Sequence, residues 1–360
     1  MKAKSSRLDD MIDHKSKWLE GSGPLTDIVV SSRIRIARNI ADIPFATKAK
    51  EADLKEVIKQ VEAAVKTSPS LKKAIYLNMN ELSELDRTFL LERHLISHDF
   101  AESKIERAVI IDKKENVSIM INEEDHLRIQ VMQSGLQVSN AWKLANKIDD
   151  ELESKVNYAF NHPWGYLACC PTNTGTGLRA SVMVHLPALV FNKKINKLLE
   201  GVTRLGLAVR GLYGENTQVK SVFFQISNQV TLGQTEEEII DNVERIAKQV
   251  VEHEQTARKT LLKNSRVTVE DSIWRAYAVL KNARTITSEE SRDCISAVRL
   301  GAEIGIIKDI ETSTLNELLI LTQPAHIQKM LGVELEPGAR DIKRAELIRS
   351  KLSIKGEKNV

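Results

Sequence analysis

The sequence predicts an α/β (α+β) fold for its first part and an all-helical fold for its last part. Apolar and polar residues alternate over 31–38, 117–121 and 181–186, which is typical of strands. Apolar residues follow helical spacing over 50–67, and a capping box starts a long helix that runs from 235 to about 258. From about 266 onward only helical patterns remain. We therefore expect two domains, 1–258 and 259–360, in a chain of 360 residues.

The composition excludes several classes of protein. The 52 basic and 49 acidic residues nearly cancel, and a net charge of +3 argues against a broad surface for nucleic acid. The three cysteines, Cys169, Cys170 and Cys294, are too few for a disulfide framework or a zinc site. No apolar stretch reaches the length of a membrane span, and the N-terminus lacks the apolar core of a signal peptide. We expect a cytoplasmic protein that binds neither nucleic acid nor membrane.

The first predicted strand carries two arginines on one face. Alternation over 31–38 puts Ile34 and Ile36 on one side and Arg33 and Arg35 on the other. Like charges side by side on a strand repel each other unless an anion lies between them. Two interpretations stay open here, an anion site and an ordinary solvated strand face.

A second amphipathic helix is expected over about 81–97. His94 lies on this helix, and His98 follows four residues later. The pair does not suffice for a metal site, because no carboxylate or third ligand accompanies it. A lone histidine near a helix end more often caps the helix or packs against it.

An acidic turn lies between two of three strands expected at 105–111, 117–121 and 127–133. The turn reads Asn122-Glu123-Glu124-Asp125-His126. Three adjacent carboxylates repel one another, so they suit a site that faces a metal ion, an amine or a guanidinium. A solvated acidic turn is the alternative. Arg128 follows the turn in the next strand.

A glycine-rich loop leads into another strand, and an arginine sits at the junction. The loop runs from Cys169 to Gly177, the strand that follows begins near Arg179, and Pro187 stops it. Arg210 lies beside glycines in a similar setting. Backbone N–H groups and a guanidinium can meet an anion at such a place.

The recurring arginines and the acidic turn together suggest phosphoryl transfer. The chain has no P-loop, no dinucleotide fingerprint, no H-E-x-x-H and no protein-kinase motif set. Arginines at strand ends could instead neutralise a triphosphate and hold its terminal phosphoryl group in line. The acidic turn could hold a guanidinium acceptor, which must lose a proton before its nitrogen attacks.

The three motifs resemble those of the phosphagen (guanidino) kinase family, over roughly residues 25–255. The resemblance implies an antiparallel sheet flanked by helices, with Mg-ATP as the phosphoryl donor. It implies that Glu124 is the catalytic carboxylate beside Glu123, and that Cys170 matches the reactive cysteine of the family. It implies nucleotide contacts from Ser31, Ser32, Arg33, Ile34, Arg35, His94, Arg128, Arg179, Ala180, Ser181, Val182, Met183, Arg210, Gly211, Leu212, Tyr213, Gly214 and Glu215.

Two departures make the chain similar to bacterial protein-arginine kinases of the McsB type. Only 30 residues precede the Ser-Arg motif, where small-molecule guanidino kinases carry a helical domain, and a helical C-terminal extension follows. This likeness implies a phosphoarginine-binding regulatory site at Arg340, Asp341, Arg344 and Ala345. It also implies a homodimer, an activator protein, protein substrates that include a heat-shock repressor, and targeting of marked proteins to a Clp protease in the stress response.

We therefore predict ATP:protein-arginine phosphotransferase activity, with two alternatives. A kinase for free arginine or another small guanidino compound is disfavoured by the short N-terminal segment. A non-catalytic adaptor that reads phosphoarginine is disfavoured by the intact Glu123-Glu124 pair and arginine set. Cys170 could act as a thiolate beside the guanidinium, since nearby arginines would lower its pKa, or it could only fill space. The neighbouring Cys169 has no role that the sequence supports.

Overall fold

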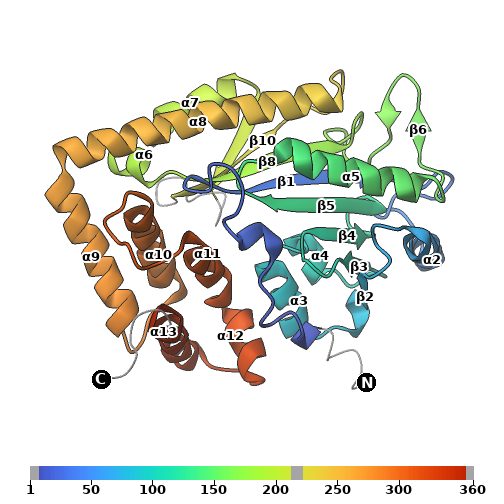
Figure 1. Ribbon diagram of the computed structural model, residues 1–360. Helices are drawn as coiled ribbons and strands as arrows, with labels where there is room; N and C mark the ends of the chain where they lie inside the picture. Colours follow the sequence, from blue (N-terminus) through green and yellow to red (C-terminus); the bar gives the residue numbers. More distant parts are fainter. Residues whose placement is uncertain (1–7, 212–221, 354–360) are drawn as a thin grey trace.

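The computed structural model of the chain describes residues 8–211 and 222–353, which are built around one large sheet (Figure 1). The strand order is β2-β3-β4-β5-β1-β8-β10-β9, and each neighbouring pair is antiparallel. The antiparallel sheet implied by the resemblance is therefore confirmed. The strands are β1 Val29–Arg38, β2 Ile75–Asn78, β3 Ala108–Ile111, β4 Val117–Ile121, β5 Leu127–Ser134, β8 Leu178–His185, β9 Leu207–Gly211 and β10 Phe223–Asn228.

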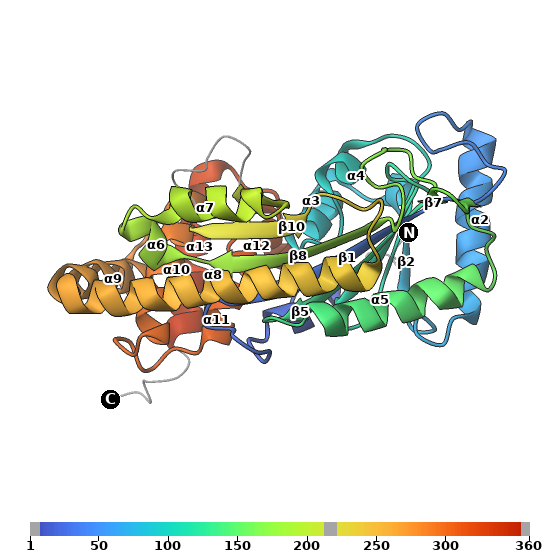
Figure 2. The same cartoon turned by 90° about the horizontal axis from the view of Figure 1, so that it is seen from above.

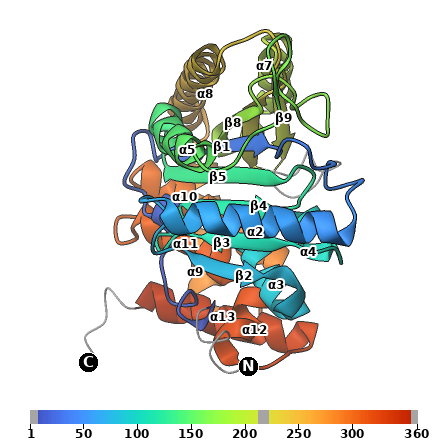
Figure 3. The ribbon, with the colours of Figure 1, turned by 90° about the vertical axis from the view of Figure 1, so that its right-hand side faces the viewer.

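Three helices cover one face of this sheet (Figures 2 and 3). They are α2 (Glu51–Thr67), α5 (Val138–Glu153) and α8 (Glu236–Asn264). Each helix is amphipathic, and its apolar side packs with the apolar side chains of β1 and β8 in one buried cluster. The capping box predicted for α8 is present, since Thr235 Oγ1 accepts from the Glu238 N–H and Glu238 accepts from the Thr235 N–H.

The opposite face of the sheet is divided into an apolar part and a polar part. Over β2 to β4 it packs against α3 (Glu84–Glu92) and α4 (His98–Glu102) in a second apolar cluster. Over β1, β5 and β8 the same face carries arginines and small polar side chains instead. The polar part of this face is therefore the place where a ligand could meet the sheet.

Several expected elements have different bounds in the structure. The helix expected over 81–97 is instead a 3-10 turn, η2 (Met79–Glu81), followed by α3 and α4. His94 lies between these two helices with a φ of +58°, so it is not helical. Ser83 and Ser97 each accept a backbone N–H and start a new helix, a signal that apolar spacing does not report. β3 begins at Ala108 rather than at 105.

Two helices follow β8 in the chain. Pro187 ends the strand and opens the short helix α6 (Pro187–Phe191), and α7 (Ile195–Arg204) follows after a turn in which Lys193 has a φ of +55°. α8 runs to Asn264, past the expected end near 258.

The last part of the chain is helical, as predicted. Its helices are α9 (Arg266–Asn282), α10 (Ser288–Glu303), α11 (Thr312–Leu321), α12 (Pro324–Leu331) and α13 (Pro337–Ser353). They fold back from α8 beside the sheet (Figure 1). α12 rests on α3, where the Glu92 carboxylate accepts hydrogen bonds from the N–H groups of Ala325 and His326, each at 2.8 Å. No helix among residues 8–211 and 222–353 is long and apolar enough to span a bilayer.

A buried polar cluster joins the sheet to α10. Arg299 donates to His185 Nδ1 (2.8 Å) and to the Thr26 carbonyl (2.6 Å). Because a guanidinium only donates, Nδ1 must accept, and Nε2 therefore carries the proton that it donates to Ser296 Oγ at 2.7 Å. This arrangement cannot activate Ser296 as a nucleophile, so the cluster is structural.

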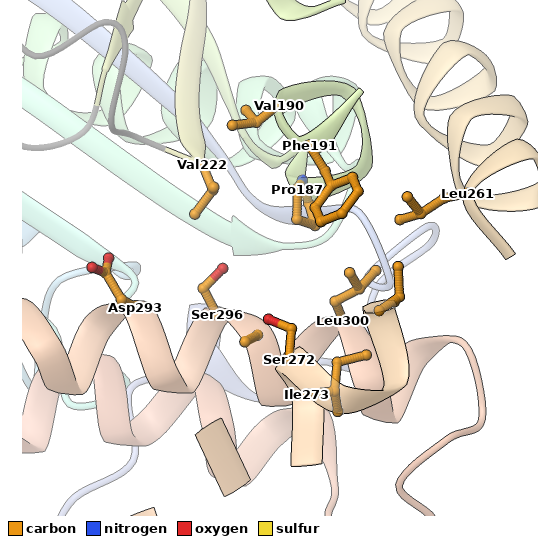
Figure 4. A pocket seen from close by; sticks show the side chains of 12 residues that line it. Pro187, Val190, Phe191, Val222, Leu261, Ser272, Ile273, Asp293, Ser296 and Leu300 are labelled. Carbon is orange, nitrogen blue, oxygen red and sulfur yellow. The ribbon is translucent and has the colours of Figure 1, made fainter. Parts of the chain in front are cut away.

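An apolar cavity of about 300 Å³ lies beside this cluster (Figure 4). It separates α6 and the start of β10 from the C-terminal helices. Its lining residues include Pro187, Phe191, Val222, Leu261, Ile273 and Leu300. None of the residues that the sequence assigned to catalysis or nucleotide binding lines it.

Candidate active site

Arginines from three neighbouring strands meet on the polar part of the sheet face. Arg33 and Arg35 lie opposite Ile34 and Ile36, which are fully buried, so the predicted alternation in β1 is confirmed. In the sheet register, Arg35 pairs with Arg179 of β8. Ala37, two residues along the same face, pairs with Arg128 of β5. The antiparallel register thus gathers arginines that lie far apart in the sequence.

The positive charge of this cluster is incompletely compensated. Burial and the charges of Arg128 and Arg179 lower the pKa of Arg33 to about 10, and burial and the neighbouring arginines lower that of Arg35 strongly. Burial and nearby arginines also lower the pKa of Arg179. The Nε atoms of Arg35 and Arg179 are buried without a hydrogen-bond partner. Repelling guanidinium groups with spare donors fit a multiply charged anion such as a polyphosphate.

A cavity of about 160 Å³ lies at one end of the arginine cluster. Arg33 reaches into this region and donates to Gln225 of β10. The lining residues are Trp18, Ser31, Arg33, His94, Met132, Ser181, Met183 and Gln225. The cavity therefore brings together five of the predicted nucleotide contacts. Trp18, Met132 and Gln225 were not predicted, because only the strand register and the fold of the N-terminal segment bring them here.

His94 is held as a neutral side chain at this cavity. Trp18, in the short helix η1 (Lys17–Leu19), packs edge to face against the His94 ring, with 5.6 Å between the ring centroids. Gln130 Nε2 donates to the His94 carbonyl at 2.7 Å. Burial and the charge of Arg33 lower the pKa of His94 to about 4. At neutral pH the imidazole therefore offers one donor and one acceptor.

The acidic turn is a tight loop in which each carboxylate has a different environment. Glu123 is buried, and its Oε1 accepts from Arg128 (2.5 Å) and from Ser97 (2.6 Å). Burial alone would raise the pKa of Glu123, but Arg128 and these hydrogen bonds lower it below its ordinary value. Glu123 is therefore ionised, and its contacts hold Arg128 in place.

Glu124 is the exposed carboxylate of the turn. Burial raises its pKa, and so do the charges of Asp125 and Glu123, while Arg128 opposes them. Glu124 lines a cavity of about 150 Å³ together with Arg35, Arg128, Arg179 and Cys170. An acceptor cation beside Glu124 would therefore share one cavity with an anion held by the arginines.

Asp125 joins the acidic turn to the cysteine loop. Its Oδ1 accepts from Asn39 Nδ2 and from the Cys169 N–H, each at 2.7 Å. The second Asn39 N–H donates to the Leu167 carbonyl at 2.9 Å, and Asn39 Oδ1 accepts from the His126 N–H at 2.9 Å. Asn39 and Asp125 are both buried. This polar clamp fixes the cysteine loop relative to Glu124, and no sequence pattern indicated it.

Arg38 braces the cysteine loop from the other side. Its Nε and Nη2 donate to Asp149 Oδ2, at 3.0 and 2.7 Å, and its Nη1 donates to the Thr176 carbonyl at 2.9 Å. Gly177 is required at the contact, because a Cβ there would lie 2.6 Å from the Ala37 carbonyl oxygen. Unlike Arg35, Arg38 has its partners within the protein.

Comparisons with known proteins show the family of the chain. Residues 56–257 match a family model described as ATP:guanido phosphotransferase, C-terminal catalytic domain, and residues 266–360 match one for the McsB C-terminal domain of protein-arginine kinase. The chain is 48% identical to a protein-arginine kinase of Halothermothrix orenii, over 96% of this chain and 99% of that protein. It is 45% identical to that of Bacillus subtilis, over 95% and 94%.

The chain belongs to the protein-arginine kinase family. It is therefore a guanidino phosphotransferase, and the adaptor alternative is excluded. Among solved structures, it is similar to a lombricine kinase at a TM-score of 0.56 and 25% identity, covering 69% of this chain and 77% of that one. A duplicated taurocyamine kinase from Schistosoma mansoni, which holds transition-state analogue components, matches at a TM-score of 0.59 and 25% identity, covering 69% and 35%.

The remaining residues predicted to contact the nucleotide have three different locations in the kinase. Arg210 is exposed on β9 opposite Gln225, and Gly211 ends that strand. Leu212, Tyr213, Gly214 and Glu215 lie outside the described residues. The side chains of Ser32, Ile34, Ala180 and Val182 are buried away from the arginine face, so only their backbone could meet a nucleotide.

The thiols of the cysteine loop lie close to hydroxyl groups. Cys170 is half-buried, and its Sγ lies 2.9 Å from Thr172 Oγ1, while Cys169 faces Thr47. No group of three metal-ligating side chains occurs in the described part of the kinase.

The predicted regulatory residues lie on α13 and do not line the cavity around Glu124. Arg344 is buried and donates to the carbonyls of Thr322 (2.7 Å) and Ile286 (2.9 Å) and to Asp341. Arg340 and Asp341 are half-buried on the same helix, and Ala345 is buried. The phosphate of a phosphoarginine that binds Arg344 would have to compete with these internal contacts. The phosphoarginine site therefore stays a prediction.

Proposed function

We propose that ATP binds with its phosphates against Arg35, Arg128 and Arg179 and its adenosine in the cavity beside Trp18 and His94. The acceptor is an arginine side chain of a protein, placed between Glu124 and Cys170. One observation carries this proposal, namely that Glu124 and the arginine cluster line the same cavity of about 150 Å³. An anionic donor and a cationic acceptor can therefore meet there.

In the proposed reaction, Glu124 orients the acceptor guanidinium and accepts one of its protons. The freed nitrogen attacks the γ-phosphorus, an N–P bond forms, and the bond from that phosphorus to the bridging oxygen breaks. ADP leaves with the electron pair, and the arginines stabilise the charge that develops on its β-phosphate. Magnesium, bound through the nucleotide, would supply additional charge neutralisation. The raised pKa of Glu124 makes its carboxylate a stronger base than an ordinary glutamate.

The experiment compares Glu124→Gln with the unchanged enzyme. Because Glu124 is exposed, the variant should fold normally and bind ATP, yet transfer to a protein acceptor should fall by at least about a hundredfold. Glu102→Gln, another exposed carboxylate, is the matched control and should stay active. Unimpaired transfer by Glu124→Gln would remove the role assigned to Glu124.

The acceptor is tested by comparing incorporation of labelled phosphate into protein and into free arginine. We expect incorporation into protein, and acid lability of the label would identify an N–P bond. Preferred transfer to free arginine would instead favour a metabolic guanidino kinase. The names of the curated relatives support the protein acceptor.

We further propose that this cytoplasmic mark directs proteins to a Clp chaperone-protease in the stress response. A heat-shock repressor is one expected substrate, and an activator protein and a second copy of the chain in a homodimer are expected partners. Phosphoarginine bound at the site of Arg340, Asp341, Arg344 and Ala345 regulates activity. The match of residues 266–360 to the McsB C-terminal domain supports this part. Titration with a phosphoarginine peptide should change turnover in the unchanged enzyme, and Arg340→Ala should abolish that response.

A further inference from the structure

A small hairpin beside the candidate acceptor site carries two exposed aromatic side chains. It consists of β6 (Phe160–Asn161) and β7 (Gly165–Tyr166) and stands out from the body of the molecule (Figure 1). Phe160 is 55% exposed and Trp164 is 56% exposed, although large aromatic side chains are usually mostly buried. Neither residue has a role in the site described above.

The hairpin is continuous with the loop that lines the acceptor cavity. The Tyr166 N–H donates to the Gly175 carbonyl at 2.8 Å, and the Gly175 N–H donates back at 3.2 Å. The loop that ends at Gly175 contributes Cys170, Thr172 and Asn173 to the cavity around Glu124. The hairpin is therefore hydrogen-bonded to the same loop that forms one wall of the cavity around Glu124.

Contacts with the core hold the hairpin rigidly. The rings of Phe160 and Tyr166 pack edge to face, with 5.2 Å between their centroids. The Arg38 guanidinium lies over the Tyr166 ring at 3.4 Å, and Asp149 fixes Arg38. Gly165, with a φ of +73°, allows close contact, since a Cβ there would lie 2.6 Å from the Gly175 carbonyl oxygen. The aromatic side chains are thus presented at a fixed position, which lowers the entropic cost of binding.

We propose that Phe160 and Trp164 form a docking surface for the polypeptide that carries the acceptor arginine, and that they contact apolar residues flanking it. This inference rests on the proposed placement of the acceptor between Glu124 and Cys170. A folded or extended protein cannot be enclosed as a small guanidino compound can, so residues beside the arginine must rest on the enzyme surface. Rigid exposed aromatics are the side chains that most often supply binding energy at such surfaces.

The size of the patch favours a transient substrate over a second copy of the chain. Two aromatic side chains bury at most about 500 Å². A stable dimer buries roughly 1,600 Å² in total. A substrate that must leave after each turnover needs only a small contact, and continuity with the cavity determines where its arginine goes.

The test uses two short synthetic peptides with one central arginine, flanked in one case by leucine and phenylalanine and in the other by glycine. For the apolar peptide, Phe160→Ala and Trp164→Ala should each raise KM by about tenfold, while kcat and the KM for ATP stay unchanged. For the glycine peptide, both variants should match the unchanged enzyme. A merely structural role would affect both peptides equally.

Phe191→Ala is the matched control, because Phe191 is 47% exposed on α6, away from the hairpin (Figure 1). It should leave the KM for both peptides unchanged. Trp164→Ala keeps the contact between Phe160 and Tyr166, so it remains a valid test if Phe160→Ala loosens the hairpin. Melting temperatures of all variants are compared first.

Two results would overturn the docking surface while the proposed function stands. One is an unchanged KM for the apolar peptide in both hairpin variants. The other is a change in oligomeric mass, by light scattering, without a change in KM, which would make the patch a self-association surface. If the unchanged enzyme phosphorylates neither peptide nor any protein, the proposed acceptor itself is wrong.

Discussion

Arg35 on the sheet is half-buried and Arg299 in the C-terminal domain is fully buried, and the two guanidinium groups have different surroundings. Burial lowers the pKa of each. Arg299 donates to Thr26, His185 and Asn316, so its hydrogen-bonding capacity is used within the protein. Arg35 lies among other arginines, and its Nε has no partner.

This difference in hydrogen bonding distinguishes arginines that stabilise the fold from arginines that are available to bind a ligand. A guanidinium whose donors are satisfied stabilises the elements it joins, as Arg299 does between β8 and α10. A guanidinium that faces like charges with spare donors costs stability, and a bound anion would remove that cost. Mutation of an arginine in the cluster should therefore lower activity without lowering stability. Mutation of an arginine that holds the fold should lower stability without lowering the activity of the folded molecules.

The largest effect is expected for Arg179→Ala. Loss of one guanidinium that faces the transferring phosphate should lower kcat/KM by up to about a thousandfold. The free energy of unfolding should stay the same or rise slightly, since one source of repulsion is removed. Steady-state kinetics and denaturant unfolding measure the two quantities. Arg179→Lys, which keeps the charge but not the fork, should recover only part of the loss.

The opposite profile is expected for Arg299→Met. The variant leaves the Thr26 carbonyl, His185 Nδ1 and Asn316 without their donor, so the free energy of unfolding should fall by about 3 kcal/mol. Turnover per folded molecule, measured well below the melting temperature, should stay close to that of the unchanged enzyme. A stable variant with low turnover would break the distinction between the two sets.

A smaller effect is expected at the clamp that joins the acidic turn to the cysteine loop. Asp125→Ala removes the acceptor of the Asn39 and Cys169 N–H groups, so the KM for a protein acceptor should rise by about tenfold. Asp125→Asn keeps an acceptor oxygen and should restore most of that loss at pH 8. The KM for ATP should not change in either variant.

Glu254→Ala is the matched control for the clamp. Like Asp125, Glu254 is a buried carboxylate that accepts two N–H groups, here the backbone N–H groups of Ala188 and Leu189, but it lies outside the site. Its removal should lower stability without changing the KM for the acceptor. An equal rise in KM for the Glu254 and Asp125 variants would mean that the clamp acts only through stability.

The smallest effect is a shift in pH dependence. Glu124 must be ionised to accept a proton, so activity should be lost as the pH falls through its pKa, which burial, Asp125 and Glu123 raise above the ordinary value. Asp99 also raises this pKa, and Arg128 opposes the increase. Asp125→Asn removes one negative charge and should move the acidic limb of kcat/KM to lower pH. A limb that stays in place would mean that another group limits the rate.

Sequence patterns predicted the parts of this protein that depend on neighbouring residues. Alternation in β1 separates Arg33 and Arg35 from the core, and the Thr235–Glu238 capping box starts α8, because both signals act within a few residues. The spacing of apolar residues predicted the wrong helix bounds near His94, where serine caps divide one expected helix into two. It also missed the aromatic hairpin, because strands of two residues have too short a pattern to detect.

The sequence by itself determined the kind of chemistry, since its arginine motifs, acidic turn and C-terminal extension resembled one kinase family. Only the tertiary structure decided which carboxylate is available. Glu123 is held by Arg128, Asp125 is held by Asn39 and Cys169, and Glu124 alone of the three is exposed. The three residues are adjacent in the chain, so their difference comes from contacts with distant segments. Strand register and long-range hydrogen bonds, which no local pattern encodes, made that choice.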